Sequence, residues 1–266
     1  MCGIGCFYSL TENSFSSDEV DILRSIHVDL SERGRRGAGI ALFSSSAGVK
    51  PKVFKTYHDS ATLWKDNEKA IKKFLINNPV RCILFHCRLP TSGSEKDPKD
   101  IHPIIYNSYF LVHNGCVNDE SVFPERKKAG VDTEAILRAI IYHDSTKGGI
   151  DHVEDSLSSH ISGSMACAMF DTEKEALYIW RDNNPIDYVK TEDGVWFTSN
   201  KDYLRHLVGE YLWSGISPGS FPGDTIMKID RDGKVESREL REHYFRNLSR
   251  SGYYGYNYED WECCIY

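Results

Sequence analysis

The chain begins MCGIGCFYSL (residues 1–10), a run of apolar and small residues that predicts a buried strand over Gly3 to Ser9. Cys2 stands at the outer end of that strand, directly after the initiator methionine. A small second residue permits removal of Met1, and Cys2 would then carry a free α-amino group beside its own thiol. Because an α-amino group titrates at about pH 8, a useful fraction is neutral at pH 7 and can take the thiol proton. One residue would thus supply both nucleophile and base.

Hydrophobic spacing beyond this strand predicts helices and hairpins in mixed order. Ser16 and Glu19 form a possible capping box for a helix that Gly34 can end. A second helix is predicted over about residues 61–75, with Ala70 among its inward-facing residues, and Asp132 can cap a third. The predicted strands are Gly39 to Phe43, Val80 to Phe85, Tyr109 to His113, Ser164 to Phe170, Ala176 to Trp180, Val195 to Thr198 and Thr225 to Ile229. This order indicates an α+β fold of antiparallel sheets with helices packed on them.

Composition limits the possible partners and compartments. The net charge of −7 does not indicate a positively charged surface that would bind nucleic acid. No apolar run approaches the roughly 20 residues of a membrane-spanning helix, and the first residues do not look like a signal peptide. We therefore expect a cytoplasmic protein without a nucleic acid or membrane partner. Residues 1–240 are expected to form the domain, and residues 241–266 an aromatic-rich tail that either packs on the domain, docks on a partner or is disordered.

Eight cysteines are spread through the chain without metal-binding spacing. Five of them are expected to be reduced and mostly buried beside strands, as is usual inside cells. These are Cys6, Cys82, Cys87, Cys116 and Cys167. Cys2 differs from these five because it directly follows the initiator methionine.

Five short segments, taken in their order along the chain, carry sequence motifs that are informative as a set. They are MCGIGCF (1–7), RGRRGAGIA (33–41), HCRLPTSG (86–93), HP (102–103) with VHNGCVN (112–118), and VDTE (131–134). Together they resemble the glutaminase half of class II glutamine amidotransferases. The resemblance covers roughly residues 2–230, and it implies the N-terminal nucleophile hydrolase fold, in which two antiparallel sheets stack face to face between helices. It further implies hydrolysis of glutamine through a γ-glutamyl thioester on Cys2, with no metal or organic cofactor.

The side-chain chemistry of these segments suits an amino-acid substrate. Arg88 can grip an α-carboxylate through two parallel hydrogen bonds, although a surface ion pair would also explain it. Asp132 can bind the α-ammonium group, or simply cap a helix. Thr91 and Ser92 could hydrogen-bond the substrate from a glycine-ended loop.

Thiolate attack on an amide creates an oxyanion that needs fixed donors. The Asn114 amide and the Gly115 N–H offer such a pair, and the alternative is an ordinary Asn-Gly turn between strands. His86 and His113 are interpreted as structural hydrogen-bonding residues, because the α-amine already fills the role of base.

Two departures from the family pattern concern the loops. Arg36 stands where the family has an acidic residue, and Cys87 and Pro90 replace an aromatic residue or threonine near the glutamine loop. Relatives usually continue into a synthase domain, so we expect a separate ammonia-using synthase partner. The rival functions are hydrolysis of an amide other than glutamine by the same N-terminal nucleophile, and a glutamine-binding regulatory subunit with an idle cysteine.

Overall fold

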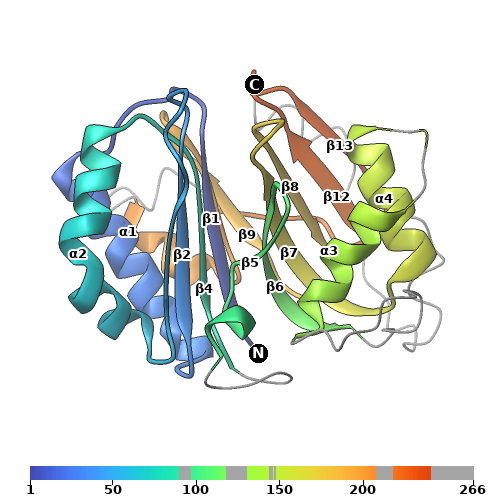
Figure 1. Ribbon diagram of the computed structural model, residues 1–266, viewed down its shortest axis with the longest axis horizontal. Coiled ribbons are helices and arrows are strands. Elements are labelled where there is room, and N and C mark those ends of the chain that lie inside the picture. The colour runs from blue at the N-terminus through green and yellow to red at the C-terminus, as the bar shows by residue number, and fades with distance from the viewer. Residues whose placement is uncertain (90–96, 118–130, 144–145, 147, 208–217, 241–266) are drawn as a thin grey trace.

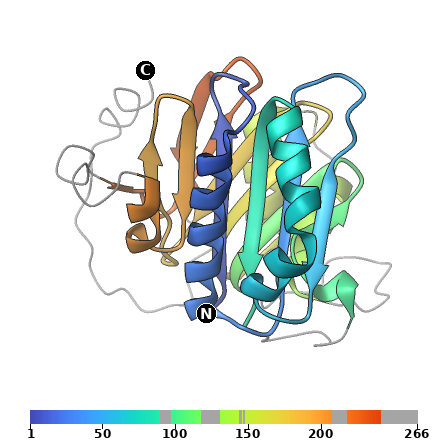
Figure 2. The ribbon, with the colours of Figure 1, turned by 90° about the vertical axis from the view of Figure 1, so that its left-hand side faces the viewer.

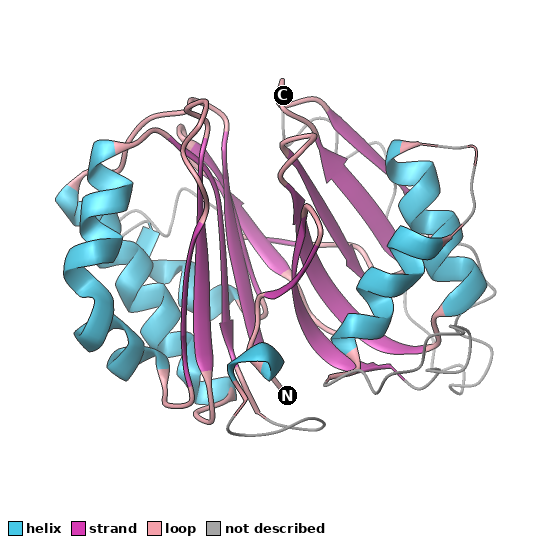
Figure 3. Cartoon of the chain, in the orientation of Figure 1, coloured by secondary structure: helices cyan, strands magenta, loops and turns pink. Residues whose placement is uncertain are grey.

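The fold is described from a computed structural model. It covers residues 1–89, 97–117, 131–143, 146, 148–207 and 218–240. Two antiparallel sheets stack face to face, and each carries a pair of helices on its outer side (Figure 1). Figure 3 shows the resulting layers of helix, sheet, sheet and helix. The predicted α+β class and four-layer arrangement are confirmed.

The first sheet has seven strands in the order β11-β9-β10-β1-β4-β2-β3. Their bounds are β1 Gly3–Ser9, β2 Ala38–Ser44, β3 Lys52–Thr56, β4 Val80–Cys87, β9 Asp187–Lys190, β10 Gly194–Thr198 and β11 Gly219–Ser220. Strand β1, predicted from the opening residues, lies at the centre of this sheet. Its neighbours β4 and β10 both run antiparallel to it.

The second sheet has six strands in the order β13-β12-β8-β7-β6-β5. Their bounds are β5 Ile104–Tyr106, β6 Tyr109–Val117, β7 Gly163–Asp171, β8 Ala176–Arg181, β12 Thr225–Ile229 and β13 Val235–Glu239. Strand β6 is longer than predicted, because it continues beyond His113 through the Asn-Gly pair. The ladder between β6 and β7 runs from Tyr109 to Val117, and this pairing explains the extra length.

Helices α1 (Ser17–Asp29) and α2 (Ser60–Asn77) cover the first sheet, as Figure 2 shows from the side. Helices α3 (Thr133–Tyr142) and α4 (Gly149–His160) cover the second. Short 3-10 helices are η1 Leu30–Arg33, η2 Pro98–Asp100 and η3 Lys201–Leu207. The capping box of Ser16 and Glu19 is present at the start of α1. Gly34 follows η1 rather than α1, so the α-helix ends four residues earlier than predicted.

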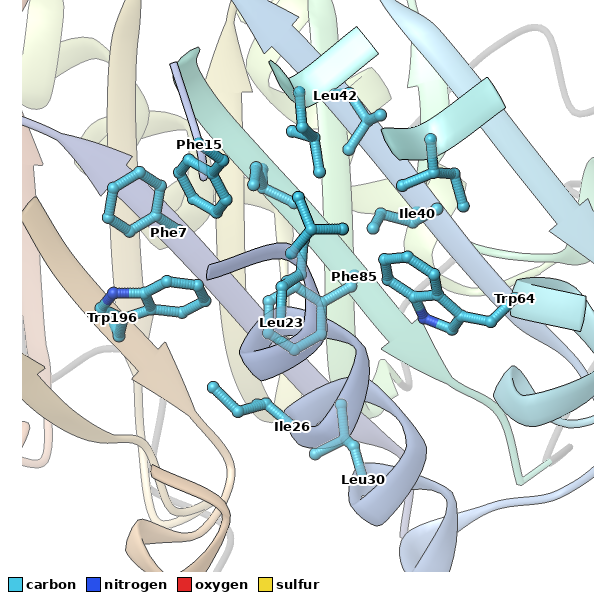
Figure 4. Close-up of a cluster of buried hydrophobic side chains, with 14 of the residues drawn as sticks. Phe7, Phe15, Leu23, Ile26, Leu30, Ile40, Leu42, Trp64, Phe85 and Trp196 are labelled. Carbon is cyan, nitrogen blue, oxygen red and sulfur yellow. The ribbon is translucent and has the colours of Figure 1, made fainter. Parts of the chain in front are cut away.

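Apolar residues form three buried clusters, one under each helix pair and one between the sheets. Phe7 points from β1 toward α1, where it packs beside Phe15 and Trp196 (Figure 4). Ile4 and Cys6 on the same strand belong to the cluster between the sheets. Because side chains alternate along a strand, the even-numbered residues of β1 face the second sheet. Cys2 continues that series.

Candidate active site

The register of the central strands places Cys2 beside Arg88. Gly3 pairs with Cys87 across β1 and β4, so the next position along brings Cys2 opposite Arg88. The Cys2 thiol donates to the Leu89 carbonyl at 3.3 Å, and the Leu89 N–H lies 3.3 Å from the same sulfur. The Arg33 Nε donates to the Cys2 carbonyl at 3.0 Å. These contacts fix both the backbone and the sulfur of Cys2.

The groups around Cys2 shift the pKa of its thiol in opposite directions. Burial raises the pKa of the Cys2 thiol above its ordinary value and is the largest effect. The Leu89 N–H and the positive charges of the chain terminus and Arg88 oppose this increase, whereas Asp132 adds to it. The net effect keeps the thiol protonated at neutral pH, so a nearby base is needed to form a thiolate.

Arg88 is almost completely buried, which excludes the alternative of a surface ion pair. Its backbone N–H donates to the Gly37 carbonyl at 2.7 Å, and its carbonyl accepts from the Arg36 N–H at 3.0 Å. A Cβ at Gly34 would lie 2.3 Å from the Arg88 carbonyl carbon. The glycines of the RGRRG segment therefore allow two stretches of backbone to touch and to hold Arg88 at the end of β4.

Asn114 and Gly115 lie inside β6, so the alternative of an ordinary turn is wrong. Asn114 has the strand parity of Val112, which packs between the sheets, and its side chain therefore faces the first sheet. Its Nδ2 is buried and has no hydrogen-bond partner within the described residues. A Cβ at Gly115 would lie 1.9 Å from the Ser164 carbonyl oxygen, so only glycine fits there.

Asp132 caps α3 and also faces the pocket. One carboxylate oxygen accepts from the Thr133 N–H at 2.9 Å, and the other accepts from the Val117 N–H at 3.0 Å. A carboxylate offers about four lone-pair sites, and these two hydrogen bonds occupy two of them. The helix cap and a role in binding a cationic group are thus compatible.

An open pocket at the junction of the two sheets brings these groups together. Its lining is Cys2, Arg88, Leu89, His102, His113, Gly115, Val131, Asp132 and Thr133. Four of the predicted site residues are among them, and Asn114 is next to one of them in β6. Thr91 and Ser92 lie outside the described residues.

Sequence reasoning did not assign a role to His102 or Thr133, although both stand in motifs noted for the family. The Thr133 hydroxyl lies 2.8 Å from His102 Nε2 and 3.0 Å from His113 Nδ1. His86 stacks on His102 with ring centroids 4.1 Å apart, and its Nε2 donates to the His113 carbonyl. Burial lowers the pKa of all three imidazoles, to about 3 for His86. All three are neutral hydrogen-bonding groups, of which His102 and His113 line the pocket, in agreement with the interpretation of His86 and His113.

The other cysteines differ in exposure. Cys6, Cys82, Cys87 and Cys167 are buried and reduced as expected, whereas Cys116 is exposed on β6. Cys116 lies opposite Ser164, beyond Val112, the last residue of β6 that belongs to the cluster between the sheets. Within the described part of the chain, His, Cys, Asp and Glu form no group able to hold a metal ion, and no helix is long and apolar enough to cross a membrane.

Residues 86–206 match the family model of the glutamine amidotransferase domain. The predicted resemblance to the glutamine amidotransferases is confirmed. The matched residues include Arg88, Asn114, Gly115 and Asp132, and Cys2 precedes them.

Solved structures support the fold of this chain. The glutamine phosphoribosylpyrophosphate amidotransferase from B. subtilis superposes with a TM-score of 0.65 at 19% identity, over 91% of this chain and 50% of that one. A structure described as the allosteric regulatory enzyme of purine biosynthesis gives a TM-score of 0.66 at 18% identity. This match also covers 91% of this chain and 50% of that one. The N-terminal nucleophile hydrolase fold implied by the resemblance is thereby confirmed.

A curated relative is the 7-cyano-7-deazaguanine synthase of Saccharolobus solfataricus, 25% identical over 215 residues. The match covers 77% of this chain and 44% of the relative. The chain therefore spans about half the length of this curated relative and of the two solved structures above.

Proposed function

We propose that this chain hydrolyses the side-chain amide of glutamine through a γ-glutamyl thioester on Cys2. The observation that carries the proposal is the pocket between the sheets, where a thiol, a guanidinium, a backbone N–H and a carboxylate converge. Glutamine presents a complementary set of groups, namely an amide carbon, an α-carboxylate, a carbonyl oxygen and an α-ammonium.

The reaction requires a base at Cys2. In the structure Met1 precedes Cys2, so the Cys2 nitrogen is part of an amide and is not basic. Removal of Met1 would convert it into an amine, which takes the thiol proton directly or through a water. The sulfur then forms a bond to the amide carbon, and the carbonyl electrons move to the oxygen.

Collapse of the tetrahedral intermediate breaks the carbon–nitrogen bond. The leaving nitrogen takes the proton held by the α-ammonium of Cys2 and departs as ammonia, and the γ-glutamyl thioester remains. Water then attacks the thioester while the amine takes a water proton. The carbon–sulfur bond breaks, the thiol regains its proton, and glutamate is released.

Asn114 and Gly115 would stabilise both tetrahedral oxyanions. The buried Asn114 Nδ2 has no partner within the described residues, and leaving a buried donor unpaired is costly. A ligand oxygen at that position would remove the cost. Such a preorganised donor contributes most when negative charge develops on the oxygen.

Arg88 and Asp132 would select the amino-acid head group. A buried guanidinium suits the α-carboxylate, because its planar fork matches the two oxygens. Asp132 lines the same pocket as Cys2 and supplies the opposite charge for the α-ammonium. Thr91 and Ser92, which follow Arg88 in the sequence, would add hydrogen bonds to the substrate.

The released ammonia would pass to an acceptor handled by a separate synthase partner. The curated relative is named as a synthase and is longer than this chain, which supports an ammonia-using activity beyond the glutamine amidotransferase domain.

Glutamine hydrolysis by the processed chain tests the proposal. Wild type should release glutamate and ammonia in equal amounts, and Cys2→Ala should release neither, because the Cys2 thiol is the group proposed to form the thioester. Cys116→Ala is the matched control, since this exposed thiol is also near the pocket and should be dispensable. Turnover of another amide but not of glutamine would favour the rival hydrolase, and glutamine binding without turnover would favour an idle regulatory subunit.

A further inference from the structure

Asn184 makes a side-chain contact to the backbone of the candidate site. It follows β8, two strands away from β6, and its Nδ2 donates to the Asn114 carbonyl oxygen at 3.0 Å. The same nitrogen lies 3.3 Å from the Ser164 hydroxyl. Because a carbonyl only accepts hydrogen bonds, the amide must face it with its NH₂ group.

The Asn114 carbonyl belongs to the same peptide unit as the Gly115 N–H. The two groups of a trans peptide point in opposite directions within one plane. A donor that fixes the carbonyl therefore also fixes the direction of the N–H. With the carbonyl turned toward Asn184 and Ser164, the Gly115 N–H points away from them.

The turn that carries Asn184 is itself anchored. The Asn184 N–H donates to Asp182 Oδ1 at 3.0 Å, and its carbonyl accepts from the Arg181 guanidinium at 3.3 Å. Asp182 is completely buried, and its N–H donates to the Met165 carbonyl at 2.9 Å, which ties the turn to β7. Asn184 is thus held at its own backbone and can hold the backbone of Asn114 in turn.

We infer that Asn184 is a positioning residue for the oxyanion-binding peptide between Asn114 and Gly115. The inference rests on the proposed function. Asn184 does not line the pocket. It acts through the peptide, by aiming the Gly115 N–H and by withdrawing electron density toward the carbonyl oxygen, which strengthens the N–H as a donor. Its contribution is realised only when an oxyanion forms.

Two variants separate this role from a purely structural one. Asn184→Ala removes the donor, and Asn184→Asp keeps the volume but places a carboxylate oxygen against the Asn114 carbonyl. Asn183→Ala is the matched control, because Asn183 is the exposed neighbour in the same turn. We expect kcat for glutamine to fall roughly 3- to 10-fold in Asn184→Ala, the range set by one ordinary hydrogen bond. We expect a larger fall in Asn184→Asp, with KM unchanged in both.

Alkylation of Cys2 by iodoacetamide is the second readout. This substitution transfers charge to iodide and builds no oxyanion on a carbonyl, so its rate reports the thiolate alone. The inference predicts unchanged alkylation rates and melting temperatures in both variants, and Asn183→Ala like wild type throughout.

Three results would overturn the inference. One is an unchanged kcat in Asn184→Asp, and another is a kcat loss matched by an equal loss of alkylation rate or by a lower melting temperature. The third is an absence of glutamine hydrolysis in the wild type, which would reject the proposed function and the role of Asn184 with it. The first two leave the proposed function intact, so the failures are distinguishable.

Discussion

At the scale of single residues, the pocket depends on side-chain parity along three strands. Cys2 and Asn114 face the space between the sheets because each continues a series of residues that pack there. Arg88 joins them because it directly follows β4, opposite Cys2. Single changes at these positions test separate roles.

Asn114→Ala removes one of the two proposed oxyanion donors. Loss of such a donor typically lowers turnover about 100- to 1,000-fold. We predict a fall of kcat in that range with a smaller change in KM, measured by steady-state glutamine hydrolysis. A raised KM with an unchanged kcat would instead assign Asn114 to ground-state binding.

Arg88→Lys retains the positive charge but loses the planar fork. We predict a raised KM for glutamine and a relative gain for amides that lack an α-carboxylate. Kinetics should be compared for glutamine and for such an analogue in the same preparations. Equal kinetics in variant and wild type would remove Arg88 from the substrate site and favour the rival amide hydrolase.

The sequence identified most of these residues through the motifs that carry them. The geometry could not be predicted where it depends on packing between distant segments. Asn184 is 70 positions from Asn114, and nothing in its local pattern marks it as a partner of that backbone. Thr133 was passed over for a similar reason, because its two histidine neighbours come from other elements.

At the scale of elements, local signals predicted the central parts of the fold well. Strand β1 has the predicted bounds, and the capping box at Ser16 begins α1 as expected. Strands at the sheet edges were missed, because β3 and β13 are half exposed and lack an apolar pattern. Ala70 was predicted to face inward on α2 but is exposed, since a small apolar residue gives only a weak signal of burial.

Gly39 on β2 marks a close approach that supports the pocket. A Cβ at this position would lie 1.9 Å from the carbonyl oxygen of His102, a pocket residue. We predict that Gly39→Ala lowers the free energy of unfolding by about 1–3 kcal/mol, as overpacking does. Urea unfolding measures the change.

Gly148→Ala is the control for Gly39→Ala. A Cβ at Gly148 would meet no atom within 4 Å, so its effect should stay below about 1 kcal/mol. Equal stabilities of the two variants would show that β2 can move away from His102 at little cost.

At the scale of the whole molecule, a chain of neutral histidines joins three layers. His27 of α1 accepts from the Trp64 indole at 3.2 Å and donates to the His86 carbonyl of β4 at 3.3 Å. His86 in turn donates to the His113 carbonyl of β6 at 3.3 Å. This series of hydrogen bonds runs from the helices through the first sheet to the second. It requires that the imidazole rings of His27 and His86 are uncharged.

This arrangement predicts loss of stability in mild acid. Burial lowers the pKa of His27 to about 4 and that of His86 to about 3, whereas the unfolded chain takes up these protons at about pH 6.5. Below pH 6.5 the unfolded state therefore binds more protons than the folded state. Each of the two residues should lower the free energy of unfolding by roughly 1 kcal/mol per pH unit between pH 6 and pH 5.

Urea unfolding at several pH values checks this prediction. Stability should be nearly constant above pH 7 and should fall steadily from pH 6.5 to pH 5. A flat profile over that interval would mean that the histidines of the folded protein are already protonated, in conflict with their burial.

The aromatic tail remains a prediction at the same scale. Residues 241–266 lie outside the described part of the chain. Deleting residues 249–266 should lower the melting temperature if the tail packs on the domain. It should abolish partner binding without loss of stability if the tail docks on a partner.

Trapping of the acyl intermediate tests the central claim most directly. Processed protein without Met1 is mixed with glutamine, quenched in acid within one turnover and analysed by mass spectrometry of its cysteine peptides. The account predicts a γ-glutamyl group on the peptide that begins with Cys2, and none on the other cysteine peptides or on a chain that retains Met1. Glutamine hydrolysis with Cys2 unmodified, or modification at another cysteine, would contradict it.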